Sequence, residues 1–304
     1  MQYNLNHKRK LNMLVTTQLT NIDPSKRCLH FLGDRILEND YRGWHLSQHN
    51  RYDYNKVRVI LEEIYKIARN GLMQIRDQDM SQRPDNIPGE EQYRELTENI
   101  KERLGSVTQD SLRKNLFVDI HKMRLIDRYG VNRERLPPDD RPSHVKYIKL
   151  APLGFNLVET YYQGNNTASN SYYVQGLANL SGLYEFVERC LKIMTFLNSS
   201  YLTEYESMFF VTALNLDTCT TAHYIGEFRA LNELQEQVIR LVQSYCDPNN
   251  FGFNKSNKRD FGNWKNETQQ IFNLLDQIIP FEYTNHIFFN HIYHILKLRG
   301  CNIH

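Results

Sequence analysis

The hydrophobic period of the chain changes between residues 106 and 150, and this change limits the folds available to it. From Leu112 to Met123 the apolar residues recur at spacings of three and four, which is typical of one buried helix face. Two short alternating runs, residues 125–129 and 145–150, then flank a basic turn that contains three prolines. Alternation with a period of two is typical of strands, so the segment predicts a helix followed by a β-hairpin.

Two more helices are expected before this segment. Residues 51–72 and 90–104 carry apolar residues at helical spacing, and a glycine ends each pattern. Thr108 is a good N-cap for a helix over residues 108–124, because its hydroxyl can accept from a free amide of the first turn. Helices followed by a hairpin are the order of a winged helix, whose second helix usually enters the major groove of DNA. The sequence therefore predicts a winged helix over about residues 90–155.

The later part of the chain is also predicted to be helical. A polar stretch over residues 165–171 is low in core-forming side chains, so we expect a boundary there. It would separate an N-terminal subdomain, residues 1–164, from a C-terminal helical subdomain, residues 172–304. Further helices are expected over residues 183–197, after Thr203, and over residues 231–245, 264–279 and 285–298. The predicted fold is mainly α with small β-hairpins: two winged-helix-like subdomains, the second over about residues 231–304, plus connecting helices.

Charge is unevenly distributed along a chain whose formal net charge is only +2. Residues 101–149 hold 12 Lys and Arg against 7 Asp and Glu, which leaves the rest of the chain mildly acidic. A basic segment on a mildly acidic body suits a surface that faces a polyanion. The same excess also fits a solvated helix face beside an ordinary hairpin, so function has to be argued from individual side chains.

The composition points to a soluble, cytoplasmic protein. The first ten residues are polar and basic, and no apolar run approaches the roughly 20 residues that a membrane-spanning helix needs. The cysteines are odd in number, far apart and without a CxxC pair, which favours free thiols in a reducing compartment over a zinc site. They are Cys28, Cys190, Cys219, Cys246 and Cys301.

Side chains suited to DNA contact gather in the basic segment. Arg, Lys, Asn and Gln on one rigid face match the donors and acceptors of base edges. On the 108–124 helix the candidates are Thr108, Gln109, Arg113, Lys114 and Lys122. The hairpin candidates are better suited to phosphates, which position a protein without specifying sequence. They are Arg133, Arg135, Arg141, His144 and Lys146.

A second basic, amide-rich segment covers residues 255–268, at the start of a predicted amphipathic helix. The basic residues before the helix are suited to contact with phosphates, and the residues of its first turns are suited to contact with base edges. The candidates are Lys255, Asn257, Lys258, Arg259, Asn263, Lys265, Asn266 and Thr268. The alternative is a surface loop with Trp264 filling a core, and we expect Trp264 and Phe261 to be core residues in either case.

No complete catalytic motif is found in the sequence. The most common restriction nuclease site needs an Asp followed by Glu-x-Lys on adjacent strands, where the carboxylates hold magnesium. The nearest fragment is Asp127 or Asp139 followed by His144, Val145 and Lys146, in which a histidine replaces the second carboxylate. His291 and His294 form an i, i+3 pair without a carboxylate partner at the right spacing, so no metal site is predicted.

Residues 116–129 and 146–154, read together, resemble the winged-helix recognition segments of type II, especially type IIS-like, restriction endonucleases. They show a short amphipathic helix followed by a strand that begins Leu-Ile-Asp-Arg. A wing then leads to a second helix that begins Ala-Pro-Leu-Gly. Two later stretches are similar to other parts of the same family: residues 201–229 to a helical module, and residues 258–272 to the start of a second winged helix. The resemblance covers roughly residues 100–299.

The resemblance implies two winged-helix subdomains that grip a short asymmetric site on double-stranded DNA, with a nuclease in a separate domain or subunit. DNA binding would need no cofactor, and Mg²⁺ would be needed only for cleavage. The leading hypothesis is sequence-specific duplex recognition, as or within a type II restriction endonuclease. Two alternatives stay open: a winged-helix transcription regulator, which would dimerise on a pseudo-palindrome, and a helical protein-interaction scaffold with a solvated basic face.

Overall fold

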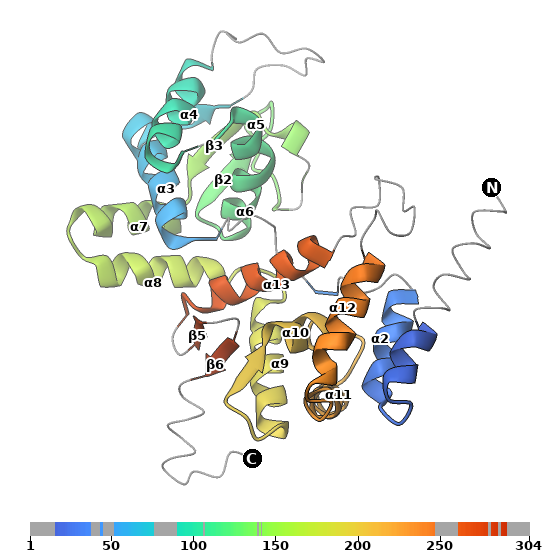
Figure 1. Ribbon diagram of the computed structural model, residues 1–304. Coiled ribbons are helices and arrows are strands. Elements are labelled where there is room, and N and C mark those ends of the chain that lie inside the picture. Colours follow the sequence, from blue (N-terminus) through green and yellow to red (C-terminus); the bar gives the residue numbers. More distant parts are fainter. Residues whose placement is uncertain are drawn as a thin grey trace, which may run out of the picture. The chain divides into compact units, whose positions relative to one another are not determined.

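The computed structural model describes residues 16–37, 43–44, 52–75, 90–105, 107–138, 140, 142–246, 261–278, 281–284 and 287–290 (Figure 1). The chain divides into two compact units, one of Asn50–Tyr184 and the other of Met1–His49 with Glu185–His304. Both units are mainly helical and each contains a small antiparallel sheet, so the mainly α prediction is confirmed.

The 50–184 unit alternates helices with short strands and ends in a helical hairpin (Figure 1). Its elements are α3 (Tyr54–Ala68), β1 (Met73–Gln74), α4 (Glu91–Leu104), α5 (Gln109–Ser111), the π-helix η1 (Leu112–Leu116), α6 (Phe117–Lys122), β2 (Ile126–Tyr129), the 3-10 turn η2 (Pro142–His144), β3 (Tyr147–Leu150), α7 (Pro152–Tyr162) and α8 (Asn166–Leu177). We call the continuous helical segment α5–η1–α6 the composite helix.

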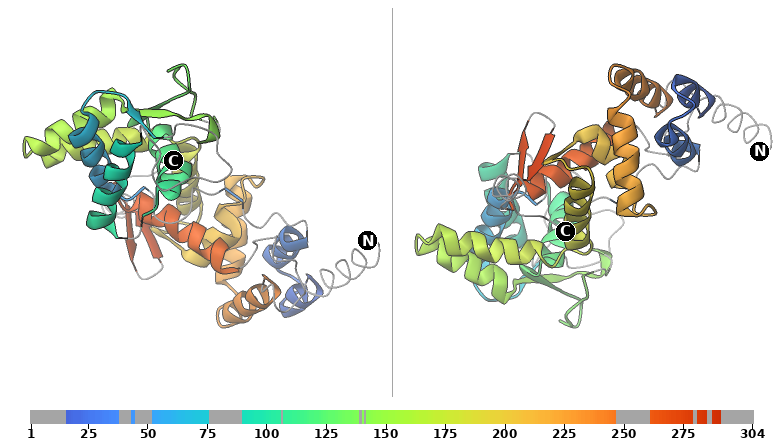
Figure 2. Two further views of the ribbon diagram at one scale, coloured as in Figure 1. Left: turned by 90° about the horizontal axis from the view of Figure 1, so that it is seen from above. Right: turned by 90° about the horizontal axis from the view of Figure 1, so that it is seen from below.

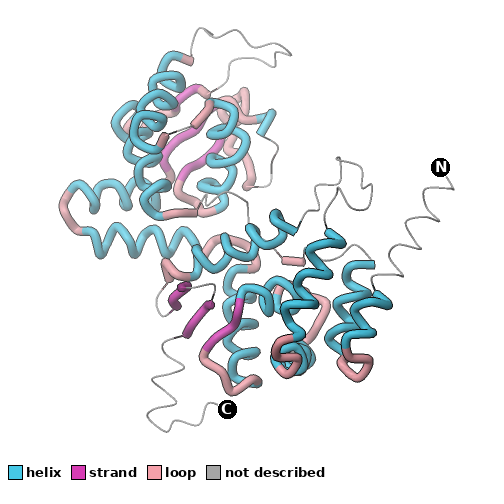
Figure 3. Tube along the Cα trace, in the orientation of Figure 1, coloured by secondary structure: helices cyan, strands magenta, loops and turns pink. Residues whose placement is uncertain are grey.

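Three strands form the sheet of this unit in the order β1-β3-β2, and both pairings are antiparallel (Figure 3). Ile148 of β3 pairs with Arg128 of β2 on one side and with Met73 of β1 on the other. The predicted hairpin is therefore confirmed. Strand β1 has no counterpart among the elements predicted from the sequence. A two-residue strand carries no readable period, and only its pairing with β3 identifies it.

Helix α3 illustrates how local signals set the helices of this unit. The side chain of Asp53 accepts a hydrogen bond from the backbone N–H of Lys56 at 2.8 Å and so caps the first turn. Val57, Ile60 and Ile64 recur at helical spacing and are fully buried. The apolar stripe faces the sheet and helices α4 and α7, and its burial provides most of the stabilisation of such a helix.

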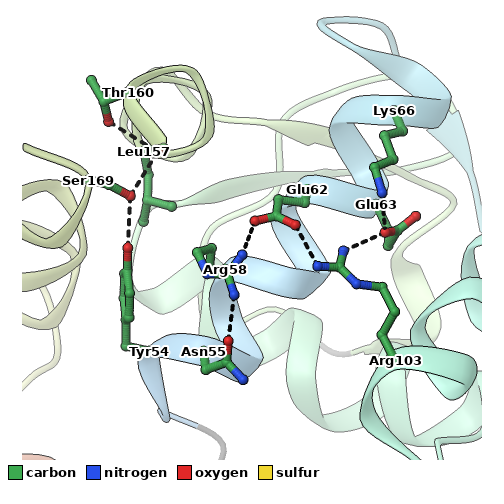
Figure 4. Close-up of polar contacts among 10 residues, drawn as sticks. All are labelled: Tyr54, Asn55, Arg58, Glu62, Glu63, Lys66, Arg103, Leu157, Thr160 and Ser169. Atoms are coloured by element: carbon green, nitrogen blue, oxygen red, sulfur yellow. Dashed lines mark hydrogen bonds and ion pairs between the residues drawn. The ribbon is translucent and has the colours of Figure 1, made fainter. Parts of the chain in front are cut away.

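Two adjacent buried carboxylates tie α3 to α4 (Figure 4). Glu62 and Glu63 are 3% and 2% exposed. The guanidinium of Arg103 donates to Glu62 at 2.7 Å and to Glu63 at 2.5 Å, while Arg58 and Lys66 donate to them from within α3. Buried charges are tolerated where they are paired and hydrogen-bonded in this way.

Helix α7 approaches the main chain of residue 125 very closely. A Cβ atom at Gly154 would lie 2.0 Å from the carbonyl oxygen of Leu125, so only glycine fits. The boundary expected over residues 165–171 is not seen, since these residues lie at the start of α8. Asn165 caps α8, and Ser169 donates to the Leu157 carbonyl oxygen of α7 at 3.0 Å. The polar composition reflects an exposed helical hairpin rather than a boundary.

The other unit joins two segments that are distant in the sequence. Its elements are a helix over residues 16–22, α2 (Arg27–Leu37), α9 (Leu183–Phe196), β4 (Tyr201–Thr203), α10 (Glu204–Glu206), the π-helix η3 (Ser207–Val211), α11 (Thr218–Arg229), α12 (Leu234–Cys246), α13 (Phe261–Leu275), β5 (Phe281–Thr284) and β6 (Ile287–Asn290). Helix α2 packs beside α11 despite their separation along the chain (Figure 2).

The sheet of this unit has the order β4-β6-β5, again with antiparallel pairings. Tyr201 of β4 pairs with Phe289 of β6, which in turn pairs with Glu282 of β5. The helix predicted over residues 285–298 is therefore wrong where the structure describes it. Ile287–Asn290 are β-branched or aromatic residues followed by an amide, and their pairing with two neighbouring strands overrides the weak helical spacing.

Aromatic packing forms the core of this unit, and the predicted core positions are confirmed. Trp264 and Phe261 are 2% and 7% exposed. The ring of Phe209 lies 5.6 Å from that of Trp264 and 5.9 Å from that of Phe228, centroid to centroid. The predicted N-cap at Thr203 is also confirmed, since its hydroxyl accepts from the backbone N–H of Glu206 at 3.2 Å.

Two buried arginines satisfy the carbonyl groups at the end of η3. Arg35 donates to the carbonyl oxygen of Phe209 at 2.6 Å and to the hydroxyl of Thr212 at 3.0 Å. Arg189 donates to the carbonyl oxygen of Val211 at 2.8 Å. The last carbonyls of a helix have no partner within it, so these side chains take the place of further turns.

Cys28, Cys190 and Cys219 are free thiols, as the sequence predicted; the side chains of the other two cysteines are not described. Burial, together with the carboxylate of Glu227, raises the pKa of Cys28 to about 12. Among the described helices, none is both long and apolar enough to cross a bilayer.

Candidate nucleic-acid interface

The composite helix begins at a well-formed cap. The hydroxyl of Thr108 accepts from the backbone N–H of Ser111 at 3.1 Å, and the hydroxyl of Ser111 accepts in return from the N–H of Thr108 at 3.0 Å. Thr108 is exposed and Gln109 half-exposed. The prediction that Thr108 caps this helix is confirmed, and the reciprocal pair fixes the direction in which the first turn points.

Arg113 does not lie on the exposed face where the sequence placed it. Its side chain is 6% exposed, and its Nη2 donates to Oδ1 of Asp110 at 2.6 Å. The Nε atom of Arg113 is buried and has no hydrogen-bond partner among the described residues. Arg113 lies within the π-helix of residues 112–116, a conformation that helical spacing in the sequence does not reveal.

Asp110 also holds the other cation of the first turns. Nζ of Lys114 lies 2.7 Å from Oδ2 of Asp110, and both side chains are 56% exposed. The hydrogen bonds and charges of Lys114 and then Arg113 outweigh burial and hold the pKa of Asp110 below its ordinary value. One ionised carboxylate thus engages two of the side chains expected to contact DNA.

The end of the composite helix carries two exposed cations, Lys122 and Arg124. No hydrogen bond or ion pair joins their side chains to the rest of the described chain. The backbone N–H of Arg124 donates to the His121 carbonyl oxygen at 2.8 Å, and that of Leu125 to the Ile120 carbonyl oxygen at 3.1 Å. These bonds form a Schellman motif in which Arg124, at φ 57°, occupies the left-handed position that usually belongs to glycine. Sequence reasoning did not single out Arg124.

Buried His121 connects the composite helix to the base of the hairpin loop (residues 130–146). Its Nδ1 lies 2.8 Å from the Ile126 carbonyl oxygen and its Nε2 lies 3.1 Å from the Leu136 carbonyl oxygen. Burial lowers the pKa of His121, although the two backbone carbonyl oxygens partly oppose this shift. The histidine fixes the loop relative to the helix without facing solvent.

A second buried residue, Arg128, holds the proline-rich arm of the hairpin loop. It is fully buried, and its Nη2 donates to the carbonyl oxygens of Pro138 at 3.0 Å and Asp140 at 3.1 Å. Neither His121 nor Arg128 was predicted to have a role. The alternation of β2 does place Arg128 on the same face as buried Ile126, and this spacing is the signal that could have found it.

The tip of the hairpin loop is a closed turn. The backbone N–H of Gly130 donates to the carbonyl oxygen of Glu134 at 3.0 Å, and Arg135 forms a β-bridge with Tyr129. Arg133, at φ 60°, is exposed and its guanidinium lies 5.8 Å from the centre of the Tyr147 ring. The tip therefore presents Arg133 in a defined place.

The remaining hairpin candidates differ in the exposure of their side chains and in their ion pairs. Arg135 is exposed, but it pairs with Asp127, Nη2 to Oδ1, at 2.6 Å. His144 is exposed and its Nδ1 lies 2.7 Å from Oδ1 of Asp140. Lys146 is half-exposed. Arg141 lies outside the described residues.

The second candidate segment is only partly described. Lys255, Asn257, Lys258 and Arg259 lie outside the described residues, as do His291 and His294. On α13, Asn263, Lys265 and Asn266 are half-exposed. Thr268 is 2% exposed and donates to the Trp264 carbonyl oxygen at 3.2 Å, so it faces the core rather than a ligand. Lys265 lies 3.7 Å from the carboxylate of Glu204 and 5.5 Å from the centre of the Tyr205 ring.

Comparison with known protein families gives a match over part of the chain. Residues 53–161 match the middle domain of the type IIS restriction enzyme MboII. The match starts at the cap of α3 and ends within α7, so it spans the whole three-stranded sheet and the composite helix. No curated protein and no solved structure matches the chain. This part of the chain is thus similar to a restriction enzyme domain, in agreement with the resemblance seen in the sequence.

Among the described residues, no group of three His, Cys, Asp or Glu side chains lies close enough together to hold a metal ion. Several carboxylates near the hairpin are instead paired with cations. Asp127 pairs with Arg135, and Asp110 pairs with Arg113 and Lys114. No residue of the described chain is therefore assigned to a Mg²⁺ ion.

Proposed function

We propose that the 50–184 unit contains a winged-helix module that recognises duplex DNA in a restriction–modification setting. The observation that carries the proposal is topological. The elements α3, β1, α4, the composite helix, β2 and β3 follow one another with the sheet order β1-β3-β2, and the match to a type IIS restriction enzyme covers this same run. In a winged helix, the helix before the hairpin enters the major groove and the hairpin loop contacts the backbone or the minor groove.

The composite helix would be the part that reads base edges. Thr108, Gln109 and Lys114 lie in its first turns, where recognition helices usually contact bases. Lys122 and Arg124 at its other end would meet phosphates, because both are exposed and free of protein partners within the described residues. The hairpin loop, held at its base by His121 and Arg128, would present Arg133 to the duplex.

A second winged-helix module is proposed in the other unit. Strand β4 comes before the helices and β5 and β6 come after them, and the sheet order β4-β6-β5 repeats the first-third-second order of the 50–184 unit. Helix α13, directly before the hairpin, takes the position of the composite helix. It carries Asn263, Lys265 and Asn266 outside its core face, and amides of this kind pair with adenine in the major groove. The module would span β4 to β6 rather than residues 231–304 alone.

Sequence-specific recognition would serve DNA cleavage by this chain or by a nuclease partner, with Mg²⁺ required for cleavage alone. The test is incubation of the purified chain with a random-sequence duplex library, with and without Mg²⁺, followed by sequencing of bound and cut molecules. We expect enrichment of a short asymmetric motif. Cuts at a fixed offset from it would assign the nuclease to this chain, and bound but uncut motifs would assign it to a partner.

Two outcomes would contradict the proposal. An enriched pseudo-palindrome bound by a dimer would favour the transcription regulator. No enrichment at low salt, where phosphate contacts are strongest, would leave the basic hairpin as ordinary surface and favour the protein-interaction scaffold.

A further inference from the structure

We propose that Asp110 is a specificity-determining residue: in the free protein it engages Arg113 and Lys114, and it releases them only at a matching DNA site. This inference rests on the proposed function, since it assumes that the composite helix meets DNA. It assigns to an acidic residue, in the middle of a basic segment, the task of weakening contact with wrong sequences.

The geometry is that of one carboxylate shared between two cations. Oδ1 of Asp110 lies 2.6 Å from Nη2 of Arg113, and Oδ2 lies 2.7 Å from Nζ of Lys114. The spacings of three and four residues place all three side chains on one side of the helix start. Each carboxylate oxygen is thus used by a different cation, and the carboxylate competes with any phosphate for both of them.

The burial and hydrogen bonding of Arg113 are a second observation that points to a ligand at the start of the composite helix. Its side chain is 6% exposed, against 56% for Asp110, and within the part of the chain that the structure describes its buried Nε has no hydrogen-bond partner. Leaving a buried donor unsatisfied is unfavourable. If Arg113 turned outward from Asp110, an acceptor supplied from outside, such as the O6 and N7 edge of a guanine, would satisfy donors that the buried position leaves incomplete.

The arrangement discriminates between matching and random DNA, because the carboxylate of Asp110 competes with DNA for Arg113 and Lys114. On random DNA the base edges do not match the two cations and mainly phosphates attract them. Asp110 both repels phosphates and retains Lys114, so the gain from releasing counterions is smaller. At a matching site, base-edge acceptors replace the carboxylate for Arg113 and Lys114. The freed carboxylate can then accept from a cytosine amino group. Specificity of this kind depends on a repulsive element as well as an attractive one.

The experiment compares Asp110→Asn with the intact protein on a random 20-base-pair duplex over a range of salt concentrations, and on the selected site. We expect the variant to bind random DNA about tenfold more tightly at low salt, with a salt slope steeper by about one. The ratio of specific to random affinity should fall. In the double variant D110N/K114Q the gain on random DNA should disappear.

Glu236→Gln is the matched control. Glu236 is exposed and pairs with Arg240, Nε to Oε1, at 3.0 Å with i, i+4 spacing, so the variant removes the same charge and a similar pair from another helix. Asp110→Ser, which keeps a residue favoured at helix starts, replaces D110N if the latter lowers the melting temperature.

Equal random-DNA affinities for D110N and E236Q would overturn the role of Asp110. Absence of salt-dependent binding by the intact protein would instead overturn the proposed function itself. The two failures are therefore distinguishable in one set of titrations.

Discussion

At the scale of single residues, Arg124 combines an unfavourable backbone with an exposed cation. A non-glycine residue at φ 57° is strained by roughly 1 kcal/mol relative to glycine. Its side chain makes no hydrogen bond or ion pair within the described residues that would offset this strain. The Schellman motif requires the left-handed position but not an arginine there. A functional role for the arginine is therefore inferred, and the junction between the composite helix and the hairpin is where DNA would pass.

Replacement of Arg124 by glycine should therefore stabilise the protein and weaken DNA binding. We expect the free energy of unfolding in denaturant to rise by about 1 kcal/mol, while affinity for all duplexes falls and the salt slope decreases by about one. The matched control is Asn198→Gly, at φ 49° in the same motif at the end of α9. It should leave DNA affinity unchanged. Unaltered affinity in R124G would remove Arg124 from the interface.

A second residue-scale prediction concerns acid stability through Glu63. Burial alone would raise the pKa of this carboxyl, but the hydrogen bonds and charges of Lys66 and Arg103 outweigh it, so the pKa lies below the ordinary value of 4.5. A pKa depressed on folding contributes stability that is present above the unfolded value and is lost as the pH falls through the folded value.

Unfolding free energies of the intact protein should thus decline as the pH falls from about 4.5, and Glu63→Gln should make this decline shallower. The measurement is denaturant unfolding at several pH values between 7 and 3. As control, Glu188→Gln alters an exposed carboxylate paired with Lys192 and should leave the slope unchanged. Parallel curves for E63Q and the intact protein would contradict the assigned pKa direction.

At the scale of elements, the contact between α7 and the end of the composite helix depends on one glycine. Gly154→Ala places a methyl group 2.0 Å from the Leu125 carbonyl oxygen, so the helix or the strand must shift. We expect destabilisation by about 1–3 kcal/mol, as overpacking of a core usually causes. Gly226→Ala in α11 is the control, because outside its own stretch of helix no atom of the described residues lies within 4 Å of the added methyl group, and alanine favours helix. Thermal melts of the two variants should therefore shift in opposite directions.

Some elements could be predicted from sequence and others could not, for a physical reason. Helix α3 has apolar residues at helical spacing over several turns, and the strands of the β2–β3 hairpin show clear alternation. Their positions therefore follow from local patterns. Strand β1 is too short to show a period, and β6 was predicted as part of a helix. Both are defined by pairing with strands elsewhere in the chain, which no local pattern records.

At the scale of the whole molecule, the two units repeat one sheet order on different helices. If both contact DNA, each should specify its own bases. Lys114→Ala should relax base positions in one part of the selected site, and Asn266→Ala should relax positions in another, each at a cost of about 1–3 kcal/mol per position. Binding-site selection with each variant checks this. Relaxation of the same positions by both variants would contradict two independent readers.

The sequence by itself determined the helical class, the hairpin, the caps at Thr108 and Thr203, and the core positions of Phe261 and Trp264. These features depend on hydrophobic period and on hydrogen bonds between near neighbours, which the chain carries locally. Only the tertiary structure decided that Arg113 is buried against Asp110, that His121 and Arg128 fix the hairpin loop, and that β4 joins β5 and β6. Each of these depends on a helical irregularity or on contacts between distant residues, and such contacts exist only once the chain has folded.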